Sequence, residues 1–312
     1  MRDAFSASLT RLALADPTVL LLTGDHGYAL FDEFRRRCPD QYINAGIAEQ
    51  NMVGMAAGLA RAGFRPFVYG LAAFVPIRTV EQIKLDVAHD DLPVVLLGDG
   101  AGFVYSHLGT SHQSTEDIAC TRAIPGLAIL SPADRHEMSA CMDHAYGLRR
   151  PVYLRMGKSD RGDVHSAPLA PLQSGRLLRL RKGRGDRPAL IATGSMVRPA
   201  LDIAQGDLDA SVWSVPIVKP LNDDDVCHAA RTSNGLIVLE EHSILGGLGS
   251  AITEIVSQHL PTRVLRIGVA DRFSQHCGTH AYLLREHGLD IDSVRTRIEH
   301  FAAFPTSGQA TT

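Results

Sequence analysis

The feature that most constrains the fold is a repeated alternation of short apolar runs with helical patterns. Val19–Thr23 is a short apolar run of the kind that forms a buried strand, and apolar residues at helical spacing precede it. The same order of strand and helix continues to Arg155, is interrupted, and restarts at Ala189. Such an alternation predicts an α/β protein with two doubly wound domains, each built on a mostly parallel sheet.

The expected elements follow from this periodicity. Strands are expected at Val19–Thr23, Tyr42–Asn44, Pro66–Tyr69, Pro93–Leu97, Leu127–Leu130, Val152–Arg155, Ala189–Ala192, Ser211–Val215, Leu236–Leu239 and Val264–Ile267. Helices are expected around Phe5–Leu12 and at Asp32–Arg37, Ala48–Ala62, Val80–Ala88, His136–Tyr146, Ala200–Ala204, Val226–Arg231, Ile252–Ser257, Tyr282–His287 and Ser293–Phe301.

The interruption between the two halves predicts where the domains meet. Residues 158–187 contain prolines, glycines and basic residues without periodicity, which is typical of a linker. We therefore expect a first domain at 1–157, a linker at 158–187 and a second domain at 188–305. The last residues, 306–312, are expected to form a disordered tail.

Composition narrows the class of protein. The chain is 45% hydrophobic and 21% charged, as in soluble globular proteins, and its formal net charge of −3 gives no basic surplus for nucleic acid. No apolar run reaches the roughly 18 residues of a membrane span, and the N-terminus lacks the pattern of a signal peptide. The five cysteines are scattered without a CxxC pair, so we expect neither disulfides nor structural zinc, and a cytoplasmic location.

Two generic motifs do not indicate a binding site. The glycines of 98–102 follow an expected strand, but the third glycine comes too early for a dinucleotide-binding loop. His276 and His280 are spaced to share a metal on a helix, but no HExxH glutamate accompanies them and Gly278 lies between them. We expect a solvated or interface pair there, and we predict no metal ligands in this chain.

The most informative stretch begins at the expected strand Tyr42–Asn44. This strand is followed by Gly46, and Glu49 then opens a helix rich in Gly and Ala. In the simplest interpretation, Glu49 only interacts with the positive end of the helix dipole. However, the helix is too apolar for a surface helix, and a strand-to-helix turn of a doubly wound sheet is where ligands bind. Glu49 is therefore a candidate functional residue.

The run Gly46-Ile47-Ala48-Glu49-Gln50-Asn51-Met52 resembles the pyrimidine-binding motif of transketolases and 1-deoxyxylulose-phosphate synthases. The resemblance covers nearly the whole chain in order. It includes the segments Phe67–Phe74, Glu81–Val87, Gly109–Ile118, Leu130–Asp134, Val238–Ser250 and Ile267–Phe273. It implies that 1–157 is a transketolase-like pyrimidine-binding domain and that 188–305 is the transketolase-like C-terminal domain.

The resemblance implies thiamine diphosphate as cofactor and assigns roles to particular residues. Glu49 would hydrogen-bond N1′ of the aminopyrimidine, as a protonated acid, and so promote loss of the proton at C2 of the thiazolium. Phe74 would stack on the pyrimidine, although it is also acceptable as a core residue. Leu71 and Ile47 would line the cofactor pocket. His112 would lie near the reacting carbon, where it transfers a proton or orients the substrate.

Other polar residues are candidate substrate contacts, and two positions depart from the family pattern. The candidates are His26, His107, Gln113 and Lys158. Transketolases carry an Asp where this chain has Leu108 and a phosphate-binding His where it has Gly100. The loss of both contacts predicts an unusual substrate.

The resemblance also implies a missing part. The glycines of 98–102 mimic the start of the cofactor's metal motif, but the Asn that should follow some 25–30 residues later is absent, and the next one is Asn222. We therefore expect a separate partner subunit that carries the diphosphate and Mg²⁺ site, in an α2β2 heterotetramer, and no activity for this chain alone.

The leading hypothesis is a subunit of a split transketolase-like enzyme. Such an enzyme would transfer a two-carbon ketol unit from a ketose donor to an aldehyde acceptor. The alternatives are an E1β-type subunit of a 2-oxo acid dehydrogenase and a non-catalytic regulatory paralogue. The run Gly46–Asn51 and the loop Ser111–Gln113 favour the transketolase.

Overall fold

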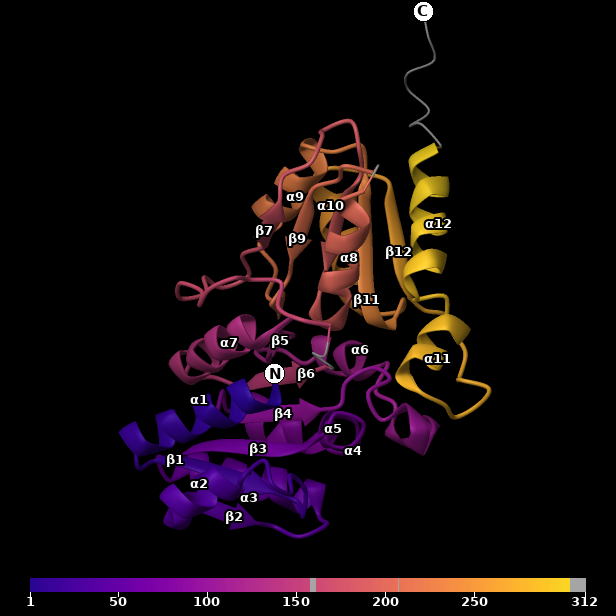
Figure 1. The fold of residues 1–312 in the computed structure, drawn as a ribbon. Coiled ribbons are helices and arrows are strands. Elements are labelled where there is room, and N and C mark those ends of the chain that lie inside the picture. The colour runs from indigo at the N-terminus through magenta and orange to yellow at the C-terminus, as the bar shows by residue number, and fades with distance from the viewer. Residues whose placement is uncertain (158–160, 207, 304–312) are drawn as a thin grey trace, which may run out of the picture.

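The computed structural model describes residues 1–157, 161–206 and 208–303. Figure 1 shows two α/β units in contact, the N-terminal one in indigo to magenta and the C-terminal one mainly in orange and yellow. Each contains a mostly parallel sheet with helices packed against it. The predicted fold class is therefore confirmed.

The first sheet has seven strands in the order β10-β5-β6-β4-β3-β1-β2. Its strands are β1 (Val19–Thr23), β2 (Tyr42–Asn44), β3 (Arg65–Leu71), β4 (Val95–Asp99), β5 (Ala128–Leu130), β6 (Val152–Met156) and β10 (Ile217–Lys219). All neighbours are parallel except β10, which comes from the second half of the chain and pairs antiparallel with β5.

Helices connect these strands and cover the sheet. They are α1 (Arg2–Ala15), α2 (Asp32–Arg37), α3 (Glu49–Arg61), α4 (Val75–Arg78), α5 (Val80–Gln82), α6 (Asp117–Arg122) and α7 (Arg135–Gly147), with a π-helical turn η2 (Ile83–Ala88) and short 3₁₀ turns η1 (Pro39–Gln41), η3 (Ser106–Leu108) and η4 (Thr110–His112). The expected helix Val80–Ala88 is thus one turn of α-helix followed by a wider π turn.

The second sheet has five strands in the order β12-β11-β8-β9-β7. They are β7 (Leu178–Arg181), β8 (Ala189–Ala192), β9 (Val212–Ser214), β11 (Leu236–Ser243) and β12 (Val264–Val269), and only β7 is antiparallel to its neighbour. The surrounding helices are η5 (Gly194–Met196), α8 (Val197–Ala204), α9 (Asp223–Arg231), α10 (Leu248–His259), α11 (His280–Glu286) and α12 (Ile291–Ala303).

The segment between the units contains more structure than expected. Strand β7 lies inside 158–187, the predicted linker. The sequence pattern does not reveal this strand because it is a partly exposed edge strand whose arginines interrupt the apolar run. Strand β10 lies inside the predicted second domain but completes the first sheet. The predicted tail, 306–312, lies outside the described residues.

A buried arginine of the first unit also contacts the second unit. Arg155 of β6 donates from Nε to Asp117 Oδ2 at 2.8 Å and from Nη2 to the carbonyl of Glu241 in β11 at 2.8 Å. Arg155 and Asp117 are both almost inaccessible to solvent. The side chain of Arg155 therefore fixes the C-terminal unit against the first sheet.

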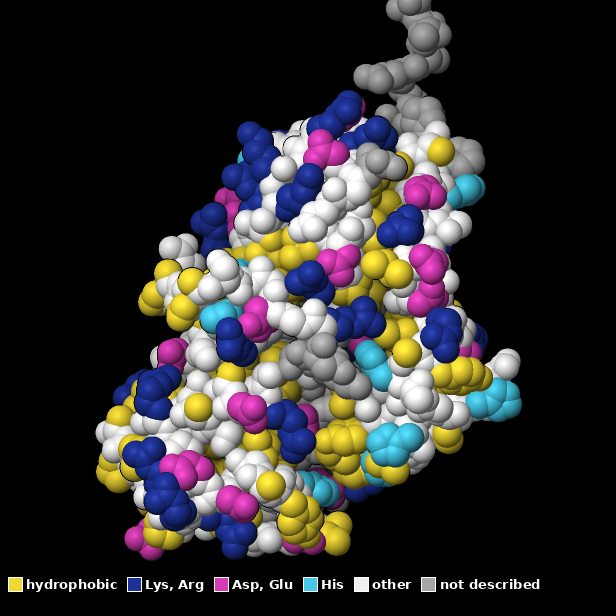
Figure 2. Space-filling model, viewed as in Figure 1, with side chains coloured by type: hydrophobic (Ala, Val, Ile, Leu, Met, Phe, Trp, Pro, Cys, Tyr) yellow, Lys and Arg dark blue, Asp and Glu magenta, His cyan; other side chains and the backbone are white. Residues whose placement is uncertain are grey.

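The described helices and one face of the surface bear on contacts with membranes and nucleic acids. Among the described residues, none of the helices has the length and apolar character needed to span a bilayer. On the face drawn in Figure 2, basic and acidic side chains are interspersed over both units. The coloured residues of that face therefore form no continuous basic stripe of the kind that follows a phosphate backbone.

Candidate active site

Four candidate residues come from four loops at one edge of the first sheet. Strands β1 to β4 are parallel, so the segments that follow them start at the same edge. His26 follows β1, Glu49 begins α3 after β2, Phe74 precedes α4 after β3, and His112 lies in η4 after β4. The topology thus gathers residues that are far apart in the sequence.

Glu49 is buried where the turn after β2 meets α3. The turn is made by Gly46, with φ of +72°, whose N–H donates to Asn44 Oδ1 at 2.9 Å. Glu49 is only 7% exposed. Arg78 Nη1 lies 3.2 Å from Glu49 Oε1, and His26 Nε2 lies 4.0 Å from the same oxygen. The second distance is too long for a hydrogen bond.

His26 and Phe74 complete this corner of the site. His26 Nε2 is buried without a hydrogen-bond partner among the described residues. The Phe74 ring is half-buried, and the guanidinium carbon of Arg78 lies 3.8 Å from its centroid. The His112 ring meets Phe74 edge-on at 5.1 Å between centroids, and the His26 ring lies at 6.4 Å. Phe74 therefore lies in the site, with ring neighbours, and not in the apolar core.

The remaining candidates differ in their placement. Leu71 ends β3 and is half-buried, whereas Ile47 exposes 78% of its surface beside Glu49. His107 is exposed in η3. Lys158 lies outside the described residues.

Gln113 connects the two units. Its side chain is buried, and Oε1 accepts a hydrogen bond from Ser274 Oγ at 2.9 Å. Ser274 Oγ also lies 3.0 Å from His287 Nε2. Gln113 Nε2 is buried with no partner among the described residues. The C-terminal unit thus fixes the loop that follows His112.

One of the two positions that depart from the family pattern, Gly100, has a structural explanation. Gly100 has φ of +84°, and a side chain there would collide with the ring of Tyr105. Tyr105 donates its hydroxyl to Asp99 Oδ2 at 3.0 Å, and burial together with Asp99 raises the pKa of Tyr105 to about 12. Leu108 is 48% exposed. Gly100 is therefore required where the Tyr105 ring packs.

Sequence reasoning missed Arg78 and Ser274. Arg78 follows Phe74 by four residues, a spacing that places two side chains on one face of a helix and could have signalled their contact. Ser274 contacts Gln113 from a distant part of the chain, and no local pattern marks it.

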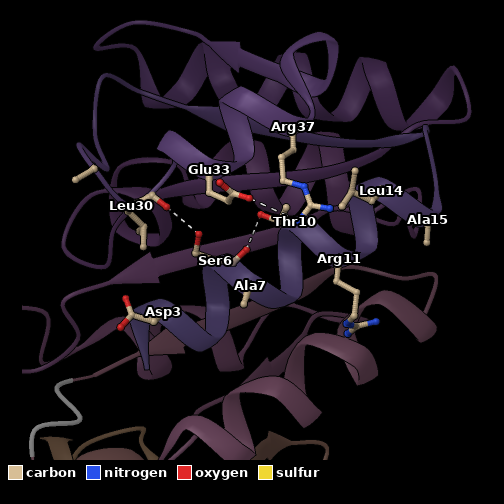
Figure 3. Close-up of a pocket in the computed structure, with 11 residues that line it drawn as sticks. Asp3, Ser6, Ala7, Thr10, Arg11, Leu14, Ala15, Leu30, Glu33 and Arg37 are labelled. Carbon is tan, nitrogen blue, oxygen red and sulfur yellow. Dashed lines mark hydrogen bonds and ion pairs between the residues drawn. The ribbon is translucent and has the colours of Figure 1, made fainter.

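The histidine pair at positions 276 and 280 and one surface cavity lie outside this site. His280 Nε2 lies 2.9 Å from Glu241 Oε1 within the C-terminal unit, and the same oxygen accepts a hydrogen bond from the Phe103 N–H of the first unit at 2.7 Å, whereas His276 is exposed. The described residues contain no group of three or more His, Cys, Asp or Glu suited to a metal. A surface cavity of about 670 Å³ between α1 and α2, shown in Figure 3, shares no residue with the cluster around Glu49.

Two protein-family models match this chain. The family model of the transketolase pyrimidine-binding domain matches residues 1–162. The family model of the transketolase C-terminal domain matches residues 175–294. The chain belongs to the transketolase family. The resemblance stated from the sequence is confirmed.

Individual transketolase relatives differ in length. One of the subunits of the apulose-4-phosphate transketolase of Phocaeicola vulgatus is 32% identical over 304 residues, which is 96% of each chain. The 1-deoxy-D-xylulose-5-phosphate synthase of Ralstonia pickettii is 38% identical over 279 residues, which is 88% of this chain but 43% of the synthase. This chain therefore spans less than half of that relative.

A solved structure is similar over its full length. It is described as a split gene transketolase in an inactive beta4 tetramer, with 30% identity and a TM-score of 0.87. The match covers 98% of both chains.

Proposed function

We propose that this chain is one subunit of a split transketolase-like enzyme that uses thiamine diphosphate. The enzyme transfers a two-carbon ketol unit from a ketose donor to an aldehyde acceptor. The observation that carries the proposal is the meeting of Glu49, Phe74 and His112, which come from three separate loops, at one edge of the first sheet. These are the residues to which the family resemblance assigns the cofactor and the chemistry.

The site fits the aminopyrimidine end of the cofactor. It offers a buried carboxyl group at Glu49, an aromatic face at Phe74 and, at His26, a buried ring nitrogen that has no hydrogen-bond partner among the described residues. Glu49 would hold the proton that is donated to the ring nitrogen, and Phe74 would stack on the ring. When bound, thiamine diphosphate supplies the electron sink for carbon–carbon bond cleavage and formation.

His112 is suited to act on the substrate. Its ring lies beside Phe74, and its Nδ1 is 2.9 Å from Ser111 Oγ, a hydrogen bond that orients the imidazole. The hydrogen bond between Gln113 and Ser274 fixes the same loop from the other unit. A fixed imidazole near the reacting carbon can move a proton to or from a substrate hydroxyl or carbonyl group.

We propose that a partner subunit supplies the diphosphate and Mg²⁺ ligands, in an α2β2 assembly. The names of two relatives support this, because one is a subunit of a transketolase and the other is a split gene transketolase. Within the described part of the chain, no group of three or more His, Cys, Asp or Glu is suited to a metal. We also propose a cytoplasmic location. All five cysteines lie in the described part of the chain and are free thiols, as is usual for proteins of a reducing compartment.

We also propose that at least one substrate differs from the usual sugar phosphates. The Tyr105 ring fills the space beside Gly100, so no phosphate-binding side chain fits there, and Leu108 offers no hydrogen bond. A charge-assisted hydrogen bond to phosphate is worth about 1.5–3 kcal/mol. Turnover of ribose 5-phosphate and xylulose 5-phosphate with ordinary transketolase efficiency would contradict this part of the proposal.

Reconstitution tests the proposed function. The chain is mixed with a partner that has the transketolase diphosphate-binding domain, and ketol transfer is measured with and without thiamine diphosphate and Mg²⁺. We expect cofactor-dependent transfer that requires both chains. Decarboxylation of a 2-oxo acid without ketol transfer would instead identify an E1β-type subunit. The absence of both reactions would support a non-catalytic paralogue.

A further inference from the structure

Arg78 lies where two residues of the proposed cofactor site meet. Its guanidinium carbon is 3.8 Å from the centroid of Phe74, and its Nη1 is 3.2 Å from Glu49 Oε1. The backbone carbonyl of Arg78 accepts a hydrogen bond from Gln50 Nε2 at 3.1 Å. Arg78, at the end of α4, is thus connected to α3 through both its side chain and its backbone.

The guanidinium occupies the position that an aminopyrimidine needs. Both groups are planar and carry ring-edge or terminal nitrogen atoms that can bond to a carboxyl group while their faces stack on an aromatic ring. A planar ligand in contact with Glu49 and this face of Phe74 at once would overlap the guanidinium of Arg78. The contact also keeps Glu49 as an acceptor, whereas the role proposed above requires it to donate.

The contact is weak enough to be displaced. The Arg78 side chain is 49% exposed, so both its ion pair and its cation–π contact are screened by water. His26 Nε2 lies 4.0 Å from the same Glu49 oxygen and, among the described residues, has no hydrogen-bond partner. Arg78 therefore donates a hydrogen bond to Glu49, while His26 Nε2 is left without a partner among the described residues.

On the basis of the proposed function, we propose that Arg78 is a placeholder for the aminopyrimidine in the unassembled subunit. It covers Phe74 and pairs with Glu49 until the cofactor displaces it. A ligand that binds both Glu49 and Phe74 must displace Arg78 from them. Its apparent affinity is therefore reduced in proportion to the fraction of subunits in which Arg78 has left these two residues. Arg78 is in this sense a positioning residue, which acts through Glu49 and Phe74.

The test compares binding of the neutral aminopyrimidine fragment of thiamine to variants of the isolated chain. The fragment lacks the thiazolium and the diphosphate, so neither charge repulsion from Arg78 nor the absent metal site affects it. Arg78→Met keeps the length of the side chain, and Arg78→Ala removes it. Arg61→Met is the matched control, because Arg61 is an exposed arginine of α3 that pairs with Asp90 instead of Glu49. Ligand-observed NMR titration gives the dissociation constants.

We expect both Arg78 variants to bind the fragment about tenfold more tightly than the wild type, and Arg61→Met to bind like the wild type. Equal or weaker binding by the Arg78 variants would overturn the proposal, as would no binding by any of the proteins. The reconstitution assay on the wild-type chain judges the proposed function separately. Ketol transfer there, together with unchanged fragment binding in the variants, would reject only the role of Arg78.

Discussion

Substitution of Arg155 by Met tests the buried ion pair that Arg155 forms with Asp117 in the first unit. Arg155 Nε lies 2.8 Å from Asp117 Oδ2, and the Tyr153 hydroxyl donates to the same oxygen at 2.6 Å. Arg155 Nη2 also donates to the carbonyls of Glu241 and Ser114, at 2.8 and 3.3 Å. Met has a similar length and can fill the space, so the substitution removes mainly the charge and the hydrogen bonds.

The expected magnitude follows from burial. Arg155 and Asp117 are 3% and 0% exposed in their side chains, so the variant leaves the Asp117 carboxylate buried without its cation. Breaking a buried pair in this way costs about 3–5 kcal/mol. The exposed pair of Arg198 and Asp202, with a separation of 2.9 Å, contributes only about 0–1 kcal/mol and serves as the comparison.

The assay is urea unfolding of the isolated chain. We expect Arg155→Met to lower the free energy of unfolding by about 3–5 kcal/mol and Arg198→Met by less than about 1 kcal/mol. Adding Asp117→Asn to Arg155→Met should recover part of the loss, because the buried charge is then gone. A loss below about 1 kcal/mol for Arg155→Met would refute the reasoning, since the pair would then behave like a surface contact.

Two further predictions concern Glu49 and the buried pair of Glu240 and His242. In the reconstituted enzyme, Glu49→Gln should slow hydrogen–deuterium exchange at C2 of the bound cofactor by orders of magnitude, with a much smaller loss of cofactor affinity; exchange at the wild-type rate would exclude this role. Burial raises the pKa of Glu240 from 4.5 to about 7 and lowers that of His242 from 6.5 to about 4. Between pH 4.5 and 7 the folded chain keeps a Glu240 proton that the unfolded chain has lost, so Glu240 makes stability fall as pH rises. Between pH 4 and 6.5 the unfolded chain binds a His242 proton that the folded chain does not, so His242 makes stability rise with pH. Glu240→Gln should therefore give a urea midpoint that rises more steeply than the wild type's between pH 4 and 6.5, and parallel profiles would contradict these assignments.

The sequence predicted most of the fold because strands such as Val19–Thr23 and Ala189–Ala192 are buried on both faces and leave unbroken apolar runs. Strand β7 was missed because an edge strand needs no such run, and its arginines face partly to solvent. Strand β10 is short and pairs with a strand of the other unit, which local periodicity does not reveal. Short edge and crossover strands therefore required the three-dimensional structure.

The candidate site was partly predictable for a related reason. Glu49, Phe74 and His112 lie in local motifs that the family resemblance identifies, and the structure places them together. The partners that hold them come from elsewhere: Arg78 reaches Glu49 from another helix, and Ser274 reaches Gln113 across 161 residues of sequence. Contacts of this kind depend on tertiary packing, so a sequence read segment by segment does not contain them.

Calorimetry with thiamine diphosphate and Mg²⁺ tests the central claim, that this chain provides only half of a cofactor site, most directly. The isolated chain is titrated first, and an equimolar mixture with the diphosphate-binding partner is titrated under the same conditions. We predict weak binding to the isolated chain, without dependence on Mg²⁺, and tight Mg²⁺-dependent binding to the mixture. Tight Mg²⁺-dependent binding to the isolated chain would contradict the account, because one chain would then hold both ends of the cofactor.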